Sequence, residues 1–174
     1  MKEIILNGKK AAGRVALVDD EDYQLVSQYK WHILEEKRPG RLHGPYAVSS
    51  IKRADGSGTT IRMHCLILGA TNIDHRDGNG LNNQRSNLRI ATDTQNKANG
   101  YSRSGTSKFK GVYRSKYRWI ATIRINGKTY YIGSFTVEED AACAYDTAAR
   151  KAWGEFARLN FAGPNEQSAL GEGN

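Results

Sequence analysis

The sequence predicts an α+β protein, and three stretches of the chain carry that prediction. The first 62 residues hold several short runs of β-forming residues separated by polar turns. Residues 61–99 read as a strand, a polar loop, a second strand and a capped helix start. Residues 108–161 read as three strands followed by one helix. We therefore expect a β-rich N-terminal lead-in, a small segment of two strands and a helix, and a C-terminal three-stranded antiparallel sheet with one helix.

Composition excludes several classes of protein. The chain has 174 residues, of which 25% are charged and 39% hydrophobic, which is typical of a globular rather than a disordered chain. No apolar run approaches the ~20 residues of a membrane helix, and MKEIILNGKK has too short an apolar core for a secretory signal. We expect a cytoplasmic protein without membrane contact. Cys65 and Cys143 form no C-x-x-C pair, so we expect neither a structural zinc site nor, in a reducing compartment, a disulfide.

The charge of the chain is basic and unevenly distributed. The formal net charge is +8, and residues 101–161 hold 11 Lys and Arg against 5 Asp and Glu. A basic surplus alone favours nucleic acid only weakly, because many basic proteins bind none. Its concentration in the C-terminal third is the stronger indication.

The N-terminal lead-in is expected to be a scaffold. Trp31–Leu34 and Tyr46–Ile51 read as strands, with the Gly- and Pro-containing KRPGRLHGP as the loop between them. His32 and His43 are given no functional role. The remaining elements are two strands and a helix with an acidic first turn, in EIIL, RVALV and DDEDYQLVSQY.

The segment after the lead-in carries the candidate chemistry. IRMHCLIL runs from a strand into a short helix, NIDH ends a second strand, RDGNGLNNQRSN is a polar loop, and LRIAT returns as a strand. Thr92 and Gln95 form a T-x-x-Q capping box, which puts Thr92 at a helix N-cap and Asn96 in or just past the first turn. The helix can then pack so that Asn96 faces Asp74.

These residue types fit phosphodiester hydrolysis. Neutral imidazole can take a proton from water near neutral pH, so His75 is the candidate general base. A hard cation prefers oxygen ligands and keeps several waters, and Asp74 and Asn96 offer a carboxylate and an amide oxygen. A lone Asp-His pair is usually only a turn, and an Asn-rich loop can bind calcium. The calcium-loop spacing is not met here, because Leu81 stands where an oxygen ligand is needed.

The segment resembles the HNH endonuclease family of the phage and intron homing type. The resemblance implies a ββα-metal fold with one Mg²⁺ or Mn²⁺, Asp74 and Asn96 as metal ligands, and His75 as general base. It also implies that Asn87 braces the loop and orients His75, and that His64 lies near the phosphate. Cys65 stands where relatives often carry Arg. The residues that carry the match are Asp74-His75, Asp77-Gly78-Asn79, Asn82-Asn83, Asn87-Leu88-Arg89 and Asn96, of which Asn79, Asn82 and Asn83 are expected to brace the loop.

The C-terminal segment predicts a sheet with one free face. Asn126-Gly127 between two strand-like runs indicates a hairpin, and Thr136-x-x-Glu139 predicts the start of a helix that ends at Gly154. Small residues at Ala141, Ala144, Ala148 and Ala152 are expected to line the face of this helix that packs on the sheet. Alternation places Arg118, Ile120, Thr122 and Arg124 on one face of the central strand, and Trp119, Ala121 and Ile123 on the other.

This stretch resembles the ethylene-response-factor (APETALA-type) DNA-binding domain through GVYRS, WIATIRI, YIGSF, the helix with AAxAYDxAA, and LNF. The resemblance implies that the sheet docks in the major groove of double-stranded DNA, where Arg can read guanine. Departures at Tyr113, Thr122 and Tyr131 mean that the base preference of the plant proteins does not transfer. Tyr145 and Asp146 are expected to brace the helix. The expected DNA contacts are Arg114, Lys116, Arg118, Trp119, Thr122, Arg124, Lys128 and Tyr131.

We expect residues 1–99 to form the nuclease domain, with the ββα-metal motif at about 62–99. Residues 100–107 are expected to be a linker, 108–161 the DNA-binding domain and 162–174 a flexible tail. The expected function is that of a site-specific, homing-type DNA endonuclease that leaves 5′-phosphate and 3′-hydroxyl ends. The open alternatives are a non-catalytic DNA-binding regulator that keeps an HNH scaffold, and a structure-selective or RNA nuclease. A monomer in a phage-infected or bacterial cell is expected, with a dimer left open.

Overall fold

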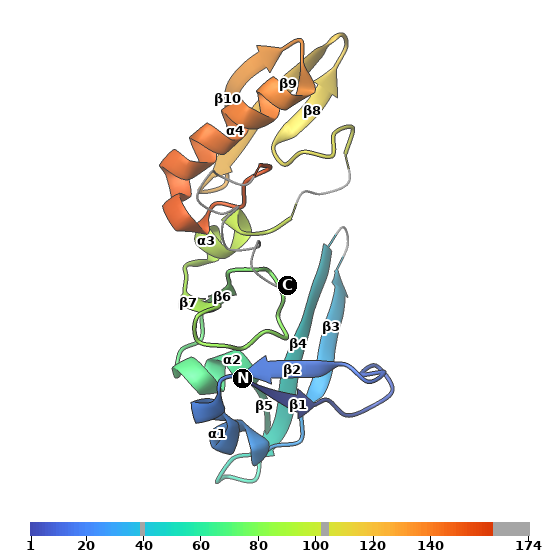
Figure 1. Cartoon of the computed structure of the whole chain (residues 1–174), viewed down its shortest axis with the longest axis vertical. Helices are drawn as coiled ribbons and strands as arrows, with labels where there is room; N and C mark the ends of the chain where they lie inside the picture. The colour runs from blue at the N-terminus through green and yellow to red at the C-terminus, as the bar shows by residue number, and fades with distance from the viewer. Residues whose placement is uncertain (39–40, 102–104, 162–174) are drawn as a thin grey trace, which may run out of the picture. The chain divides into compact units, whose positions relative to one another are not determined.

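The computed structural model describes residues 1–38, 41–101 and 105–161. The chain divides into two compact units, Met1–Asp93 and Thr94–Asn174. Both combine helices with small antiparallel sheets, so the predicted α+β class is confirmed (Figure 1). The linker prediction falls partly on residues 102–104, and the tail prediction on 162–174, which lie outside the described residues. Among the described helices, none has the length and apolar character to cross a membrane.

The first unit opens with the hairpin and acidic helix that the sequence predicts. β1 (Lys2–Ile5) pairs antiparallel with β2 (Val15–Val18), and the chain then turns through η1 (Asp20–Asp22) into α1 (Tyr23–Ser27). Every second residue of β2 is buried, as expected for a strand with one face on a core. The largest fully buried side chains of this core are Trp31, Met63, Val18, Val26 and Asn83.

A three-stranded antiparallel sheet follows, in the order β3 (His32–Arg38), β4 (Arg41–Lys52) and β5 (Gly58–Arg62). The prediction of a loop across KRPGRLHGP is wrong in part, because β4 already begins at Arg41. The pairing shifts register between Leu34↔Tyr46 and Glu36↔His43, so two residues of β4, including Pro45, oppose one residue of β3. Proline has no N–H for a regular ladder, and such a bulge is where a strand accepts it.

The candidate catalytic segment closes the first unit. α2 (Met63–Leu68) ends at Gly69 with φ 64°, and β6 (Ile73–His75) pairs antiparallel with β7 (Leu88–Ile90). α3 (Asp93–Ala98) begins directly after Thr92, as the capping box predicts, and its first residue marks the boundary between the units.

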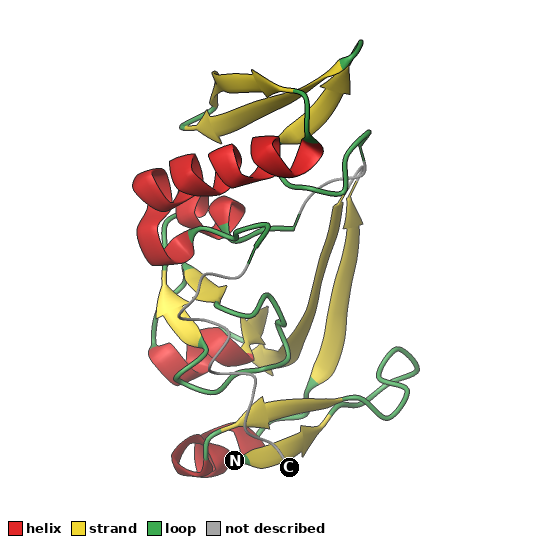
Figure 2. Ribbon diagram, turned by 45° about the horizontal axis from the view of Figure 1, so that its top comes forward, coloured by secondary structure: helices red, strands yellow, loops and turns green. Residues whose placement is uncertain are grey.

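The second unit holds a sheet in the order β10 (Lys128–Phe135), β9 (Arg118–Ile125) and β8 (Val112–Ser115), followed by α4 (Glu138–Trp153) and η2 (Gly154–Phe156). The turn between β9 and β10 has φ 50° at Asn126 and 82° at Gly127, which confirms the predicted hairpin. Figure 2 shows α4 lying along one face of this sheet. Its buried residues pack with Val112, Ala121 and Ile123.

One detail predicted for α4 is wrong, and a second is right only in part. Its N-cap is Val137, without a side-chain cap bond, so the Thr136 capping box does not form. Instead, the acidic first turn complements the helix dipole, and Ser107 Oγ donates to Glu138 Oε1 at 2.6 Å. The predicted alanine stripe is right in part, because Ala141 is buried and Ala148 packs against the core. The buried face is nevertheless centred on Tyr145, and Ala152 is exposed. The buried residues of α4 are Ala141, Ala142, Tyr145, Asp146 and Ala149.

Candidate active site

Asp74 and His75 lie side by side on the short strand β6, and both are buried, with 5% and 6% of their surface exposed. Antiparallel pairing sets Asp74 directly opposite Arg89 of β7. Arg89 Nη2 lies 2.6 Å from Asp74 Oδ2, and Arg89 Nε donates to the same oxygen at 2.8 Å. Arg89 was named only as part of the family resemblance, and its pairing with Asp74 was not predicted. The predicted metal ligand is therefore held in a buried ion pair.

His75 belongs to a cluster of three aromatic rings. The ring centroids of His64 and His75 lie 4.8 Å apart with perpendicular planes, and the ring of Tyr46 lies 5.5 Å from His64 and 6.0 Å from His75. His64 comes from α2 and Tyr46 from β4, so three separate elements meet at the candidate base. The Nδ1 atom of His64 is buried and makes no hydrogen bond within the described part of the chain.

Burial lowers the pKa of both imidazoles, because it disfavours their charged forms. It lowers the pKa of His64 to about 3, with further lowering by the neighbouring His75 and Arg62. Burial also lowers the pKa of His75, against the opposing effects of the Asn83 hydrogen bond and the carboxylates of Asp77 and Asp74. A neutral His75 can accept a proton at pH 7, and a neutral His64 cannot act as a cationic clamp for phosphate.

Asn83 is the side chain that contacts Nε2 of His75. Asn83 is fully buried, its Nδ2 donates to the carbonyl of Leu81 at 3.1 Å, and its Oδ1 lies 3.5 Å from His75 Nε2. An amide oxygen accepts, so this contact fits the tautomer in which Nε2 carries the proton and Nδ1 is the basic nitrogen of the ring. Asn83 was predicted only as a loop-bracing residue.

The loop between β6 and β7 is tied together by side-chain bonds to Asp77. Asn87 Oδ1 accepts from the Asp77 backbone N–H at 3.0 Å, and Asn87 Nδ2 donates to Asp77 Oδ1 at 3.0 Å and to the Asn82 carbonyl at 2.8 Å. Asn82 Nδ2 donates to Asp77 Oδ2 at 2.9 Å, and Asn79 Oδ1 accepts from the Leu81 N–H at 3.1 Å. The motif asparagines thus hold one loop conformation.

The lead-in anchors the same loop from outside. The Leu17 N–H donates to the Leu81 carbonyl and the Asn83 N–H donates to the Leu17 carbonyl, both at 2.8 Å, so the loop pairs with the edge of β2. Gly80 packs so closely on β4 that a Cβ there would lie 2.4 Å from the Pro45 carbonyl oxygen and 2.5 Å from the ring of Tyr46.

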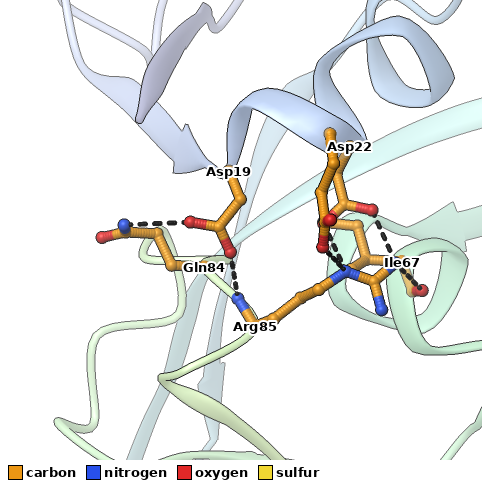
Figure 3. A network of polar contacts seen from close by, with 6 residues as sticks. Asp19, Asp22, Ile67, Gln84 and Arg85 are labelled. Carbon is orange, nitrogen blue, oxygen red and sulfur yellow. Dashed lines mark hydrogen bonds and ion pairs between the residues drawn. The ribbon is translucent and has the colours of Figure 1, made fainter.

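A second anchor is the polar network in Figure 3. Asp22, which is buried, receives two bonds from the Arg85 guanidinium at 2.7 and 2.8 Å, and Asp19 accepts from the Arg85 N–H at 2.8 Å and from Gln84 Nε2 at 3.2 Å. Arg85 also pairs with Glu21 at 2.9 Å. The sequence indicated only that these acidic residues open a helix. Their contacts show that the lead-in also holds the loop between β6 and β7.

Asn96, the other predicted metal ligand, lies in the middle of α3, in the second unit. In the described ranges no group of three or more His, Cys, Asp or Glu side chains gathers as a metal cluster. The donor types nevertheless suit a hard cation, because such a cation takes a carboxylate and an amide oxygen and fills its remaining positions with water. The Asp74 carboxylate is already engaged by Arg89 through Oδ2.

The predicted DNA contacts divide between the two faces of the second unit's sheet. Thr122 lies opposite Tyr131 and Arg124 opposite Thr129, on the face away from α4. Arg118 shares that face and donates to Ser134 Oγ and O, each at 2.8 Å.

The other predicted contacts lie on the side of the sheet that faces α4 or in the turn between β8 and β9. Trp119 packs with the cluster under α4, and Arg114, directly opposite it, holds its guanidinium 4.8 Å from the indole centroid. Lys128 lies opposite Ile125 on the same side as Trp119, and Lys116 lies in the turn between β8 and β9 with φ 51°. Tyr113 and Tyr131, 45% and 66% exposed, were noted as family departures and share the open face.

Comparisons with known proteins identify the family of this chain. It is 34% identical over 152 residues, 87% of its length, to an uncharacterized HNH endonuclease of Acanthamoeba polyphaga mimivirus, of which it covers 77%. This chain belongs to the HNH endonuclease family. It is also 40% identical over 90 residues, half of its length, to Protein 3.8 of Escherichia phage T7, of which it covers 74%. No family model matches the chain.

The C-terminal part of this HNH family member has separate relatives. An ethylene-responsive transcription factor of Arabidopsis thaliana is 44% identical over 68 residues, which are 37% of this chain and 16% of the plant protein. The match to the mimivirus HNH endonuclease confirms the predicted HNH resemblance. The ethylene-response-factor resemblance rests on a fragment of each plant relative.

The lowered pKa of His75 predicts the pH dependence of cleavage. His75 accepts a proton only when neutral, and a folded-state pKa below 6.5 keeps it neutral to lower pH. The single-turnover rate should therefore fall on the acid side with a midpoint below pH 6.5, and should not fall between pH 8 and 6.5 through this group. A rate-against-pH profile on one DNA duplex measures this. A midpoint above 6.5 would contradict the geometry around His75.

Replacing Asn83 should release the His75 ring. Asn83→Leu removes the acceptor for Nε2–H, so we expect the cleavage rate to fall about 10- to 100-fold. The ¹⁵N chemical shifts of His75 should change from a single tautomer to a mixture. Asn79→Ala, which removes another bond of the same loop, is the matched control and should leave the tautomer unchanged. Identical shifts in wild type and Asn83→Leu would show that Asn83 does not set the tautomer.

Proposed function

We propose that this chain is a metal-dependent DNA endonuclease in which His75 is the general base. The observation that carries this proposal is the buried, neutral His75 ring, oriented by Asn83 and adjacent to the ion-paired Asp74. Membership of the HNH endonuclease family supports it. The order β6, polar loop, β7 and α3 also supports a ββα-metal arrangement.

In the proposed reaction His75 Nδ1 takes a proton from water, and the oxygen of that water forms a bond to phosphorus. The bond from phosphorus to the 3′ oxygen breaks, and the leaving oxygen takes a proton from solvent. The products carry 5′-phosphate and 3′-hydroxyl ends. A Mg²⁺ or Mn²⁺ ion, for which Asp74 and Asn96 are the proposed ligands, would supply neutralisation of the charge on the phosphate and on the leaving oxygen. Asn83 and the Asp77-centred bonds keep the base in place.

His64 is proposed to support His75 rather than to clamp the phosphate by charge. The two rings are in perpendicular contact, and burial holds the pKa of His64 at about 3, so it stays neutral at the pH of the reaction. Its buried Nδ1 can bond to a water or a phosphate oxygen that enters the site.

The second unit is proposed to bias cleavage towards particular DNA sites, as in a homing enzyme. The face away from α4 presents Arg118, Thr122, Arg124 and Tyr131 together, and Arg and Thr are side chains that can read base edges in the major groove. The plant relatives named as transcription factors match this part of the chain. The basic surplus of residues 101–161 adds attraction to the DNA backbone.

Arg124→Ala should weaken site choice without changing the chemistry. Arg124 is exposed on the free face, where its Nε donates to the Gly127 carbonyl at 3.2 Å. Loss of one base-reading arginine should reduce discrimination between sites by about 10- to 100-fold. Sequencing of cleavage positions in a random DNA library measures this, with Arg150→Ala on α4 as the charge-matched control. The same site profile for wild type and Arg124→Ala would contradict a reading role.

Plasmid cleavage distinguishes the nuclease from a DNA-binding regulator. Supercoiled plasmid should become nicked with Mg²⁺ and wild-type protein, and should stay supercoiled with chelator. Binding of intact plasmid at every metal concentration would favour the regulator instead. Competition between duplex DNA and RNA at controlled salt concentration identifies the preferred substrate, and stronger cleavage of RNA would overturn the DNA assignment.

A further inference from the structure

The six-residue helix α3, which carries Asn96, is too short to be stable alone. Isolated helices below about 12 residues are marginal in water, and the last carbonyls of any helix lack partners within it. α3 spans Asp93–Ala98, and both Ala98 and Asn99 are buried. The partners of its C-terminal carbonyls therefore contribute to holding Asn96 in place.

Those partners come from two basic residues of the second unit, Lys110 and Arg158. Lys110 Nζ donates to the carbonyls of Ala98 and Gly100, the latter at 2.6 Å. Arg158 donates from its backbone N–H to Ala98 O at 3.2 Å and from Nε to Asn99 O at 2.7 Å. Two cations at the negative end of a helix also complement its dipole.

Both basic residues are themselves fixed to the rest of the second unit. The Lys110 N–H donates to Asn160 Oδ1 at 2.6 Å, and Asn160 Nδ2 donates back to the Lys110 carbonyl at 3.1 Å. The Asn160 N–H donates to both carboxylate oxygens of Asp146, a buried residue of α4, at 2.8 and 3.0 Å. The Arg158 guanidinium lies 4.0 Å from the ring centroid of Tyr101. A continuous set of bonds thus runs from α4 to the end of α3.

We propose that Lys110 and Arg158 are positioning residues. They attach the C-terminal end of α3, the helix that carries Asn96, to the rest of the DNA-binding unit. This rests on the proposed function, because Asn96 matters only if it holds the metal. The consequence is that the proposed metal ligand is held by the same unit that selects the DNA site. The start of the predicted linker, residues 100–101, is accordingly a fixed part of the second unit.

Hydrogen exchange of the full-length chain tests the positioning directly. In Lys110→Met combined with Arg158→Met, the amides of α3 should exchange about tenfold faster or more, because the charged contacts to the carbonyls of Ala98 and of Asn99, just after the helix, are lost. The amides of β9 should keep their protection, which separates loss of positioning from unfolding of the unit. Lys108→Met, which lies two residues away and contacts the ring of Phe109 at 4.9 Å, should behave as wild type. Unchanged exchange of α3 in the double variant would overturn the proposal.

A Mn²⁺ titration, followed by the electron paramagnetic resonance signal of the free ion, provides the second readout. The double variant should need several-fold more Mn²⁺ for half-saturation, and Lys110→Arg should restore much of the affinity. Equal Mn²⁺ affinity with faster α3 exchange would contradict the link to Asn96. Failure of the wild type to bind Mn²⁺ or to cut DNA would refute the proposed function instead, while the exchange result would still decide whether Lys110 and Arg158 hold α3.

Discussion

His75→Ala should lower the single-turnover rate of DNA cleavage by about 10²- to 10⁴-fold, the usual contribution of a positioned general base. The substitution removes the nitrogen that takes the proton from water. It should leave DNA affinity nearly unchanged, because the sheet face of the second unit carries the proposed binding residues. The rate should be measured at saturating protein and Mg²⁺ on an end-labelled duplex, so that binding does not enter the result.

His32→Ala is the matched control for this substitution. His32 is exposed on β3, where its Nδ1 lies 3.2 Å from the Asn7 carbonyl oxygen. Its replacement should leave the cleavage rate within about twofold of wild type, as for other surface changes away from a site. Equal rates for wild type and His75→Ala would remove His75 from the mechanism.

Gly111→Ala should unfold or severely destabilise the second unit. Gly111 has φ +77°, and a Cβ there would lie 2.0 Å from the ring of Tyr145 and 2.7 Å from the Thr122 carbonyl oxygen. Tyr145 is only 3% exposed and is packed between α4 and the sheet, so it cannot move aside cheaply. Left-handed backbone costs about 1–2 kcal/mol, and overpacking adds about 1–3 kcal/mol.

Thermal unfolding and site-selective DNA binding measure this effect. We expect a lower unfolding temperature for the second unit and loss of site-selective binding. Gly127→Ala is the control, because Gly127 has a similar φ of +82° but nothing within 4 Å of a Cβ. Gly127→Ala introduces backbone strain without a steric clash, so it should lower the unfolding temperature less than Gly111→Ala. Equal stability of the two variants would show that Tyr145 can move away from position 111.

Patterns within short stretches of sequence predicted most elements of the fold. Alternation and turn residues located β8, β9 and β10, and the Asn126-Gly127 turn formed as expected. The T-x-x-Q box located the start of α3. These features depend on neighbours in the chain, which a sequence displays directly. The strand through Pro45 was missed because its bulge depends on the partner strand β3.

The contacts around the candidate site could not be predicted from such local patterns. The Asp74–Arg89 pair joins residues 15 apart, and the Arg85–Asp22 pair joins residues 63 apart. Such contacts depend on how separate elements pack, and several other carboxylates stand equally close in sequence. The approach of His64 to His75 and the contact of Asn83 with its Nε2 likewise follow from the docking of α2 and the β6–β7 loop.

The most direct measurement is the chemistry of the cut ends. Wild-type protein should convert supercoiled plasmid to nicked circles in Mg²⁺, and DNA ligase should reseal those nicks without prior kinase or phosphatase treatment. That outcome requires adjacent 5′-phosphate and 3′-hydroxyl ends, as left by water attack on phosphorus with loss of the 3′ oxygen. Nicks that form in the presence of chelator, or that carry 3′-phosphate or covalently attached protein, would contradict hydrolysis by a His75-activated water.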